Sequence, residues 1–127
     1  MFLKSNFIIF IINFRVNFDI TARSGYSNDE VLLSCVNNLR TFFNINNWQI
    51  NKPINIGDVT GRLYNVNGVQ NVNNIKFENI FGENSGYSKF KYNFEAATQN
   101  NIIYPSLDPS IFELKYPTND IVGRVNI

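Results

Sequence analysis

The sequence contains no histidine, and only one cysteine and one tryptophan occur among its 127 residues. Without histidine, a Ser-His-Asp triad, a Cys-His dyad and a histidine-ligated zinc site are all excluded. A lone cysteine cannot form a disulfide within the chain, so a hydrophobic core must hold the fold, and we expect synthesis in a reducing compartment. The 23 asparagines include no Asn-x-Ser/Thr acceptor, which agrees with a protein that bypasses the glycosylating secretory route.

Charge is also scarce, and it is balanced. The 11 basic and 10 acidic side chains give a formal net charge of +1. No overall field would therefore collect phosphate backbones or an anionic membrane surface. Hydrophobic residues make up 44% of the chain and aromatic residues 15%, which is enough to fill one core. We expect residues 1–127 to form a single domain.

Few side chains remain that could perform chemistry. Cys35 falls on the apolar face of a predicted helix, where a small buried hydrophobe is expected rather than a reactive thiol. Asp108 with Glu113 or Asp120 is the nearest carboxylate pair for glycoside hydrolysis, but that reaction needs separations in space that a sequence does not give. We predict that the protein is not an enzyme and that it holds no metal, cofactor or small-molecule substrate.

The N-terminal region has the pattern of a long strand. Polar and apolar residues alternate strictly from Asn13 to Ile20, which indicates a strand with one buried face. The run before it, Phe7 to Ile12, has six apolar residues, too few for a signal-peptide core or a membrane span. This run would extend the strand where both faces are covered, or it would lie against a partner chain.

Two helices are predicted next. Ser27 and Glu30 have the spacing of a capping box, and apolar residues then recur with a helical period, which predicts a helix over residues 28–43. Asn55 is placed to cap a second, shorter helix, and Gly68 supplies a left-handed residue just after its end.

The rest of the chain is predicted to form strands. They are expected around Ile75 and Phe77, from Lys89 to Ala96, from Ile102 to Tyr104, and last from Ile111 to Tyr116 between two prolines. The order strand, helix, helix, strands predicts an α+β fold in which two helices pack on one face of a mainly antiparallel sheet. The alternating lysines and aromatics after residue 88 also fit a platform for single-stranded nucleic acid, although alternation would send the rings to one face and the lysines to the other.

Three blocks of the sequence resemble the inner-ring wedge proteins of contractile-tailed bacteriophage baseplates, which belong to a wider baseplate J-like group. The first block is the N-terminal strand with the helix that ends at Phe43, and the second runs from Ile56 through the turn at residues 68–72. The third and most specific combines residues 87–94 with the C-terminal stretch at 102–125. Together they cover about residues 13–126, and they match only the C-terminal part of such proteins, which are several times longer.

This resemblance implies a structural subunit of the tail baseplate wedge, located in the virion and made in the host cytoplasm. It implies partners of two kinds, a second copy in a homodimer and neighbouring wedge proteins. It implies no enzyme activity, nucleic acid or membrane. The alternative function is a small module that binds nucleic acid or carbohydrate and shares only the strand pattern.

The candidate contact residues follow from the apolar N-terminal run and from the solvent side of the last predicted strand. They are Phe7, Ile9, Ile11, Ile111, Glu113 and Lys115. Phe112, Leu114 and Tyr116 would then fill the core, although one strand pattern also permits the reverse assignment of faces. We expect a dimer that buries more than ~1,000 Å² in total, the usual minimum for a specific interface.

Overall fold

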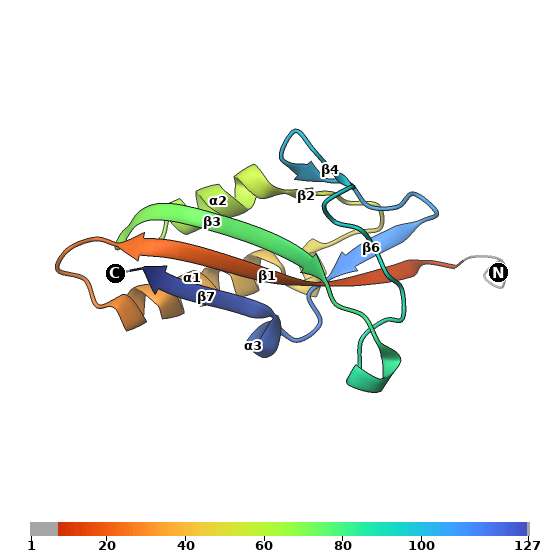
Figure 1. Cartoon of the computed structure of the whole chain (residues 1–127), viewed down its shortest axis with the longest axis horizontal. Helices are drawn as coiled ribbons and strands as arrows, with labels where there is room; N and C mark the ends of the chain where they lie inside the picture. Colours follow the sequence, from red (N-terminus) through yellow and green to blue (C-terminus); the bar gives the residue numbers. More distant parts are fainter. Residues whose placement is uncertain (1–7, 127) are drawn as a thin grey trace.

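The computed structural model describes residues 8–126 of the chain (Figure 1). In chain order its elements are β1 (Phe10–Ala22), α1 (Asn28–Phe42), β2 (Ile54–Asn55), α2 (Ile56–Tyr64), β3 (Val69–Asn79), β4 (Thr98–Gln99), β5 (Ile102–Ile103), β6 (Ser110–Glu113), α3 (Pro117–Asp120) and β7 (Ile121–Asn126), with 3-10 turns at Ile45–Asn47 and Glu83–Ser85. The predicted α+β class is confirmed. Among the helices of residues 8–126, none is long and apolar enough to cross a membrane.

The long strand β1 is the centre of the main sheet. β3 lies antiparallel along one of its edges, from Phe14 to Ala22. β6 and β7 lie parallel to β1 beside Phe10–Asn13 and Val16–Thr21. β1 lies between β3 and β6 in the sheet, and β7 must use the same edge as β6 because β3 occupies the other edge along Val16–Thr21. The main sheet is therefore mixed, and the prediction of a mainly antiparallel sheet is wrong for it. The small sheet β2-β5-β4 is antiparallel throughout.

The parallel pairing and the altered element order have one cause. After β3, the long segment at 80–109 carries the chain back to the beginning of β1. The next strand, β6, therefore runs in the same direction as β1. The chain then leaves this edge of β1 to form α3 and rejoins it as β7. Parallel neighbours require such long crossovers, whereas the turn signals in the sequence report only local reversals of direction.

The two predicted helices and their caps are confirmed. α1 begins after Ser27, whose side chain accepts a hydrogen bond from the Glu30 N–H at 3.3 Å. α2 begins after Asn55, whose Oδ1 accepts from the N–H of Gly57 at 2.9 Å. Gly68 has the expected left-handed conformation, with φ of 96°. Because capping depends on residues only two or three apart, the sequence was sufficient to place both helix starts.

The core lies between the main sheet and these helices. Every second residue of the predicted alternating strand is buried: Phe14, Val16, Phe18 and Ile20. They pack in one cluster with buried side chains of α1 and α2, which include Leu39 and Leu63. The predicted buried face of β1 is confirmed.

The segment from Lys89 to Ala96 is not a strand, contrary to the prediction. Its aromatic side chains do turn inward, since the Phe90 ring lies 4.5 Å from the Phe10 ring and Phe94 is buried. Its backbone, however, is held by side chains and not by a neighbouring strand, as when Asn79 Oδ1 accepts from the Tyr92 N–H at 2.7 Å. In this segment the alternation reflects aromatic rings that turn inward at every second residue, although the backbone does not pair with a strand.

The C-terminal region also differs from the prediction. The expected strand Ile111 to Tyr116 ends at Glu113, α3 then begins at Pro117, and β7 follows where no strand was predicted. Gly123 interrupts the apolar alternation of β7, which is why the pattern was missed. A side chain at this position would overlap the ring of Phe18, so the close approach of β7 to β1 requires glycine.

Candidate assembly surfaces

The projecting end, which we define as residues 8–13 with β6, contains most of the predicted contact residues (Figure 1). Here β1 extends beyond β3, which pairs with it only from Phe14 onward. Within residues 8–126, no strand pairs with the β3-side edge of β1 ahead of Phe14. Apolar side chains remain uncovered at this end: Ile8 is 64% exposed and Ile11 is 40% exposed.

The register brings several of the predicted contacts together. Ile11 and Ile111 are paired residues of β1 and β6, and Glu113 is paired with Asn13. Ile9, Ile111 and Glu113 are partly buried, whereas Lys115 is exposed beyond the last paired residue of β6. Phe7 lies outside the described residues. Phe112 and Leu114 are buried as predicted, but Tyr116 is 37% exposed and does not fill the core.

Asn13 ties the projecting end to the rest of the molecule. The alternating pattern placed this residue on the solvent side, yet it is fully buried. Its amide donates to Glu113 Oε1 at 2.7 Å, and its Oδ1 accepts from the Ser88 N–H at 2.7 Å. Buried polar groups are normally satisfied in this way. The Glu113 carboxylate is thus used within the chain.

The open face is the side of the main sheet turned away from α1 and α2. Three rows of paired residues cross it from β7 or β1 to β3. The first row is Arg15 with Glu78, the second is Val122, Asn17 and Lys76, and the third is Arg124, Asp19 and Asn74. Lys76 and Asn74 are exposed, so none of residues 8–126 covers this side of β3.

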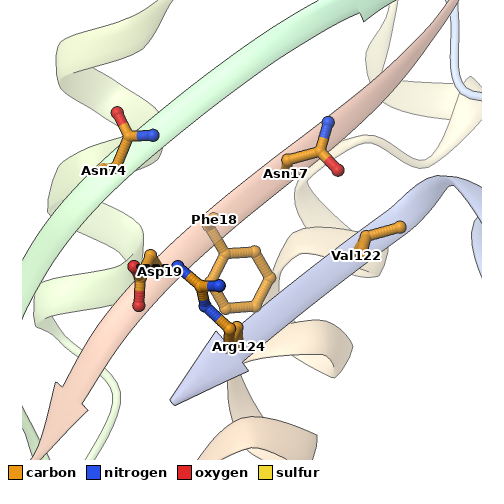
Figure 2. A pocket seen from close by; sticks show the side chains of 6 residues that line it. All are labelled: Asn17, Phe18, Asp19, Asn74, Val122 and Arg124. Atoms are coloured by element: carbon orange, nitrogen blue, oxygen red, sulfur yellow. Dashed lines mark hydrogen bonds and ion pairs between the residues drawn. The ribbon is translucent and has the colours of Figure 1, made fainter. Parts of the chain in front are cut away.

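A shallow hollow of about 240 Å³ lies on the open face around Asp19 (Figure 2). Asp19 Oδ2 accepts from Arg124 Nη2 at 3.0 Å and from Asn126 Nδ2 at 3.1 Å. Asp19 Oδ1 is buried and has no hydrogen-bond partner, which is rare for a carboxylate oxygen in a native fold. Sequence reasoning missed this hollow because it depends on β7, whose pairing with β1 was not predicted.

A second polar cluster fixes α3 and the segment before residue 88. Asp120 is fully buried, and its Oδ1 lies 3.1 Å from Arg15 Nη2. The Tyr87 hydroxyl donates to Asp120 Oδ2 at 2.8 Å. Burial, together with this hydrogen bond, raises the pKa of Tyr87. The cluster connects three segments that are distant in the sequence, and we assign it a structural role.

The carboxylates considered for glycoside hydrolysis each have a separate polar neighbour. Asp120 bonds Arg15 and Tyr87, Glu113 accepts from Asn13, and Asp108 accepts from the Ser106 hydroxyl. A glycosidase pair instead needs two carboxyl groups facing one bond, with one of them in an apolar setting. In the described part of the chain, no group of three or more Cys, Asp or Glu side chains is placed to hold a metal ion.

Cys35 is fully buried, and this burial raises the pKa of its thiol to about 11. Because the thiolate is the reactive form, we expect native protein at pH 8 to react with maleimide about 100-fold more slowly than an unshifted thiol. Labelling followed by mass spectrometry would measure this, with protein unfolded in guanidinium chloride as the control. Fast labelling of the native protein would contradict the structural role that we assign to Cys35.

No protein-family model matches the chain, and no curated protein matches it. The resemblance to baseplate wedge proteins therefore remains a prediction that rests on three blocks of sequence. The projecting end and the open face are the two surfaces of the described residues that bear on function.

Proposed function

We propose that this chain is a structural subunit of a phage tail baseplate wedge, which associates with a second copy of itself and contacts neighbouring wedge proteins. The observation that carries the proposal is the projecting end, where no strand of residues 8–126 pairs with the β3-side edge of β1 ahead of Phe14. Ile8, just before β1, and Ile11 are exposed there. An apolar strand with a free edge is a template for pairing with another chain. The sequence blocks support the choice of the baseplate among possible assemblies.

The dimer follows from the geometry of a free edge. In a closed pair of identical chains, the same patch is used on both sides of a two-fold axis. The β3-side edge of β1 ahead of Phe14 would pair antiparallel with the same edge of the second copy. On this edge the Asn13 carbonyl already accepts from the Ile80 N–H at 3.0 Å, so the pairing would use the backbone groups ahead of Asn13. It would also cover Ile8 and Ile11, which water now contacts. Residues around this edge would supply the remaining buried area.

The alternative, a module that binds nucleic acid or carbohydrate, has less support. Lys89 and Lys91 are exposed, but Phe90 packs on Phe10 and Tyr92 packs on Phe112. The rings are therefore engaged inside the fold and are not offered for stacking on bases. Salt-dependent retention on heparin or single-stranded DNA would favour this alternative over the assembly role, since phosphate binding is steeply salt-sensitive.

Carboxylates placed on the projecting end should prevent association. We expect the double substitution Ile9→Asp with Ile11→Asp to reduce the assembled mass while the fold survives, because neither side chain belongs to the fully buried core. Analytical ultracentrifugation at high micromolar concentration would measure the mass, and circular dichroism would report the fold.

A matched control is the pair Leu33→Asp with Tyr64→Asp. These side chains are 61% and 45% exposed and lie on α1 and at the end of α2, so the pair should leave the assembled mass unchanged. A monomeric wild-type protein at the same concentration would contradict the proposed function. Loss of the fold in the Ile9 and Ile11 variant would show instead that this segment belongs to the core.

A further inference from the structure

We propose that a second copy of this chain also docks on the open face, where Arg124 meets Glu78 of the other copy and Lys76 meets Asp19 of the other copy. This inference rests on the proposed self-association and adds a second surface to it. The projecting end would join one pair of copies, and the open face would join such pairs into a larger assembly.

The charged side chains of the open face are available for such a contact. Arg124 is 75% exposed. Glu78 is 41% exposed, and its Oε1 lies 3.8 Å from Arg15 Nη1 and accepts from Asn17 Nδ2 at 3.0 Å within the same chain. Lys76 is exposed, and none of the ion pairs found in residues 8–126 involves it. Asp19 carries the buried oxygen that lacks a partner. The face thus offers two positive and two negative groups that a partner can use.

The register of the sheet makes this arrangement self-complementary. Neighbouring strands are about 4.8 Å apart, and residues on one face repeat about every 6.7 Å along a strand. Arg124 and Glu78 therefore lie at opposite corners of the three-row patch, with Asn17 at its centre. A two-fold axis that runs diagonally across the face over Asn17 places Arg124 opposite the second copy's Glu78. The same rotation brings Asp19 close to the second copy's Lys76.

Symmetry doubles each contact, because residue i of one copy meets j of the other while j meets i. The strands of the two copies would cross steeply, which is one of the two common ways in which sheets pack face to face. The uncharged centre of the contact would hold Asn17 and Val122, and Val122 is 44% exposed. No like charges are brought face to face at the two paired positions.

The contact also accounts for the unpartnered oxygen of Asp19. In the single chain Arg124 lies over the Asp19 carboxylate (Figure 2). When Arg124 turns toward the second copy's Glu78, the Asp19 carboxylate becomes accessible to the second copy's Lys76. The ammonium group can then donate to Oδ1, while Asn126 keeps its hydrogen bond to Oδ2.

Two single charge reversals and their mixture test this geometry. In Arg124→Glu alone, the introduced carboxylate faces Glu78 twice, and in Glu78→Arg alone, the introduced guanidinium faces Arg124 twice. Each variant should associate through this face roughly 30-fold more weakly than the wild type. When the two variants are mixed, every facing pair is again of opposite charge, and the assembled mass should return to that of the wild type. Analytical ultracentrifugation of each variant and of the mixture measures this.

The matched controls are Arg23→Glu and Glu30→Arg, which reverse exposed charges outside the open face, in the loop after β1 and in the first turn of α1. They should change nothing, either alone or mixed. Lys76→Glu provides a further variant that places a carboxylate against Asp19 and should weaken association in the same way. Single reversals that associate like the wild type, or a mixture that fails to recover, would overturn the inference.

These outcomes are distinct from failure of the proposed function. If Ile9→Asp with Ile11→Asp lowers the assembled mass and the charge reversals do not, the projecting end is an interface and the proposal for the open face is wrong. If only the charge reversals lower the mass, and mixing restores it, the open face is an interface and the proposal for the projecting end is wrong. A monomeric wild type would contradict both proposals.

Discussion

Phe14→Ala is expected to lower the free energy of unfolding by about 3–5 kcal/mol, the usual cost of emptying a buried phenylalanine site. Phe14 is 1% exposed, so truncation leaves a cavity that water does not fill. Its ring centroid lies 5.1 Å from that of Phe43 and 5.8 Å from that of Phe77, and Phe94 and Phe112 are each 6.4 Å away. The Phe14 ring thus packs among aromatic rings from the end of α1, from β3, from the segment at 89–96 and from β6.

Such a loss would be a large part of the total, because domains of this size are typically stable by only about 5–15 kcal/mol. Urea denaturation followed by circular dichroism would measure the loss. Phe81→Ala is the matched control, since Phe81 is 44% exposed and its truncation should cost less than about 1 kcal/mol. Equal losses for the two variants would mean that the Phe14 ring is not the centre of the core.

The elements that the sequence predicted correctly depend on local chemistry. The face of β1 could be read from strict alternation, and both helix starts could be read from cap residues two or three positions away. For the segment Lys89 to Ala96 the strand prediction was wrong, because alternation indicates only which side chains turn inward. It does not report whether the backbone between them pairs with another strand.

The main sheet and both surfaces depend on contacts between distant residues. Arg15 and Asp120 lie 105 residues apart, as do Asp19 and Arg124. No local pattern states that β6 and β7 run parallel to β1, and so the charge rows of the open face could not be predicted. At the projecting end, the unbroken apolar run indicated Ile9 and Ile11 as candidate contacts, whereas Ile111 was predicted from the solvent side of the last expected strand. Asp120 was considered only as a member of a carboxylate pair, and no local pattern indicated that it is fully buried.

Arg15→Met is expected to lower the free energy of unfolding by about 2–4 kcal/mol, because it leaves the buried Asp120 carboxylate without its cation. The expected loss is somewhat below that for a fully buried pair, since the Arg15 side chain is 34% exposed. The methylene groups of methionine keep much of the packing of the arginine stem. Arg23→Met, which alters an exposed arginine just after β1, should cost less than about 0.5 kcal/mol.

The double variant Arg15→Met with Asp120→Asn separates the charge from the shape of this cluster. Asparagine keeps an oxygen that can accept from the Tyr87 hydroxyl but carries no charge to bury. The double variant should therefore recover about 1–2 kcal/mol of what Arg15→Met loses, even though it contains one substitution more. Additive losses in urea denaturation would contradict this account. They would mean that Arg15 stabilises the fold through packing and not by compensating the Asp120 charge.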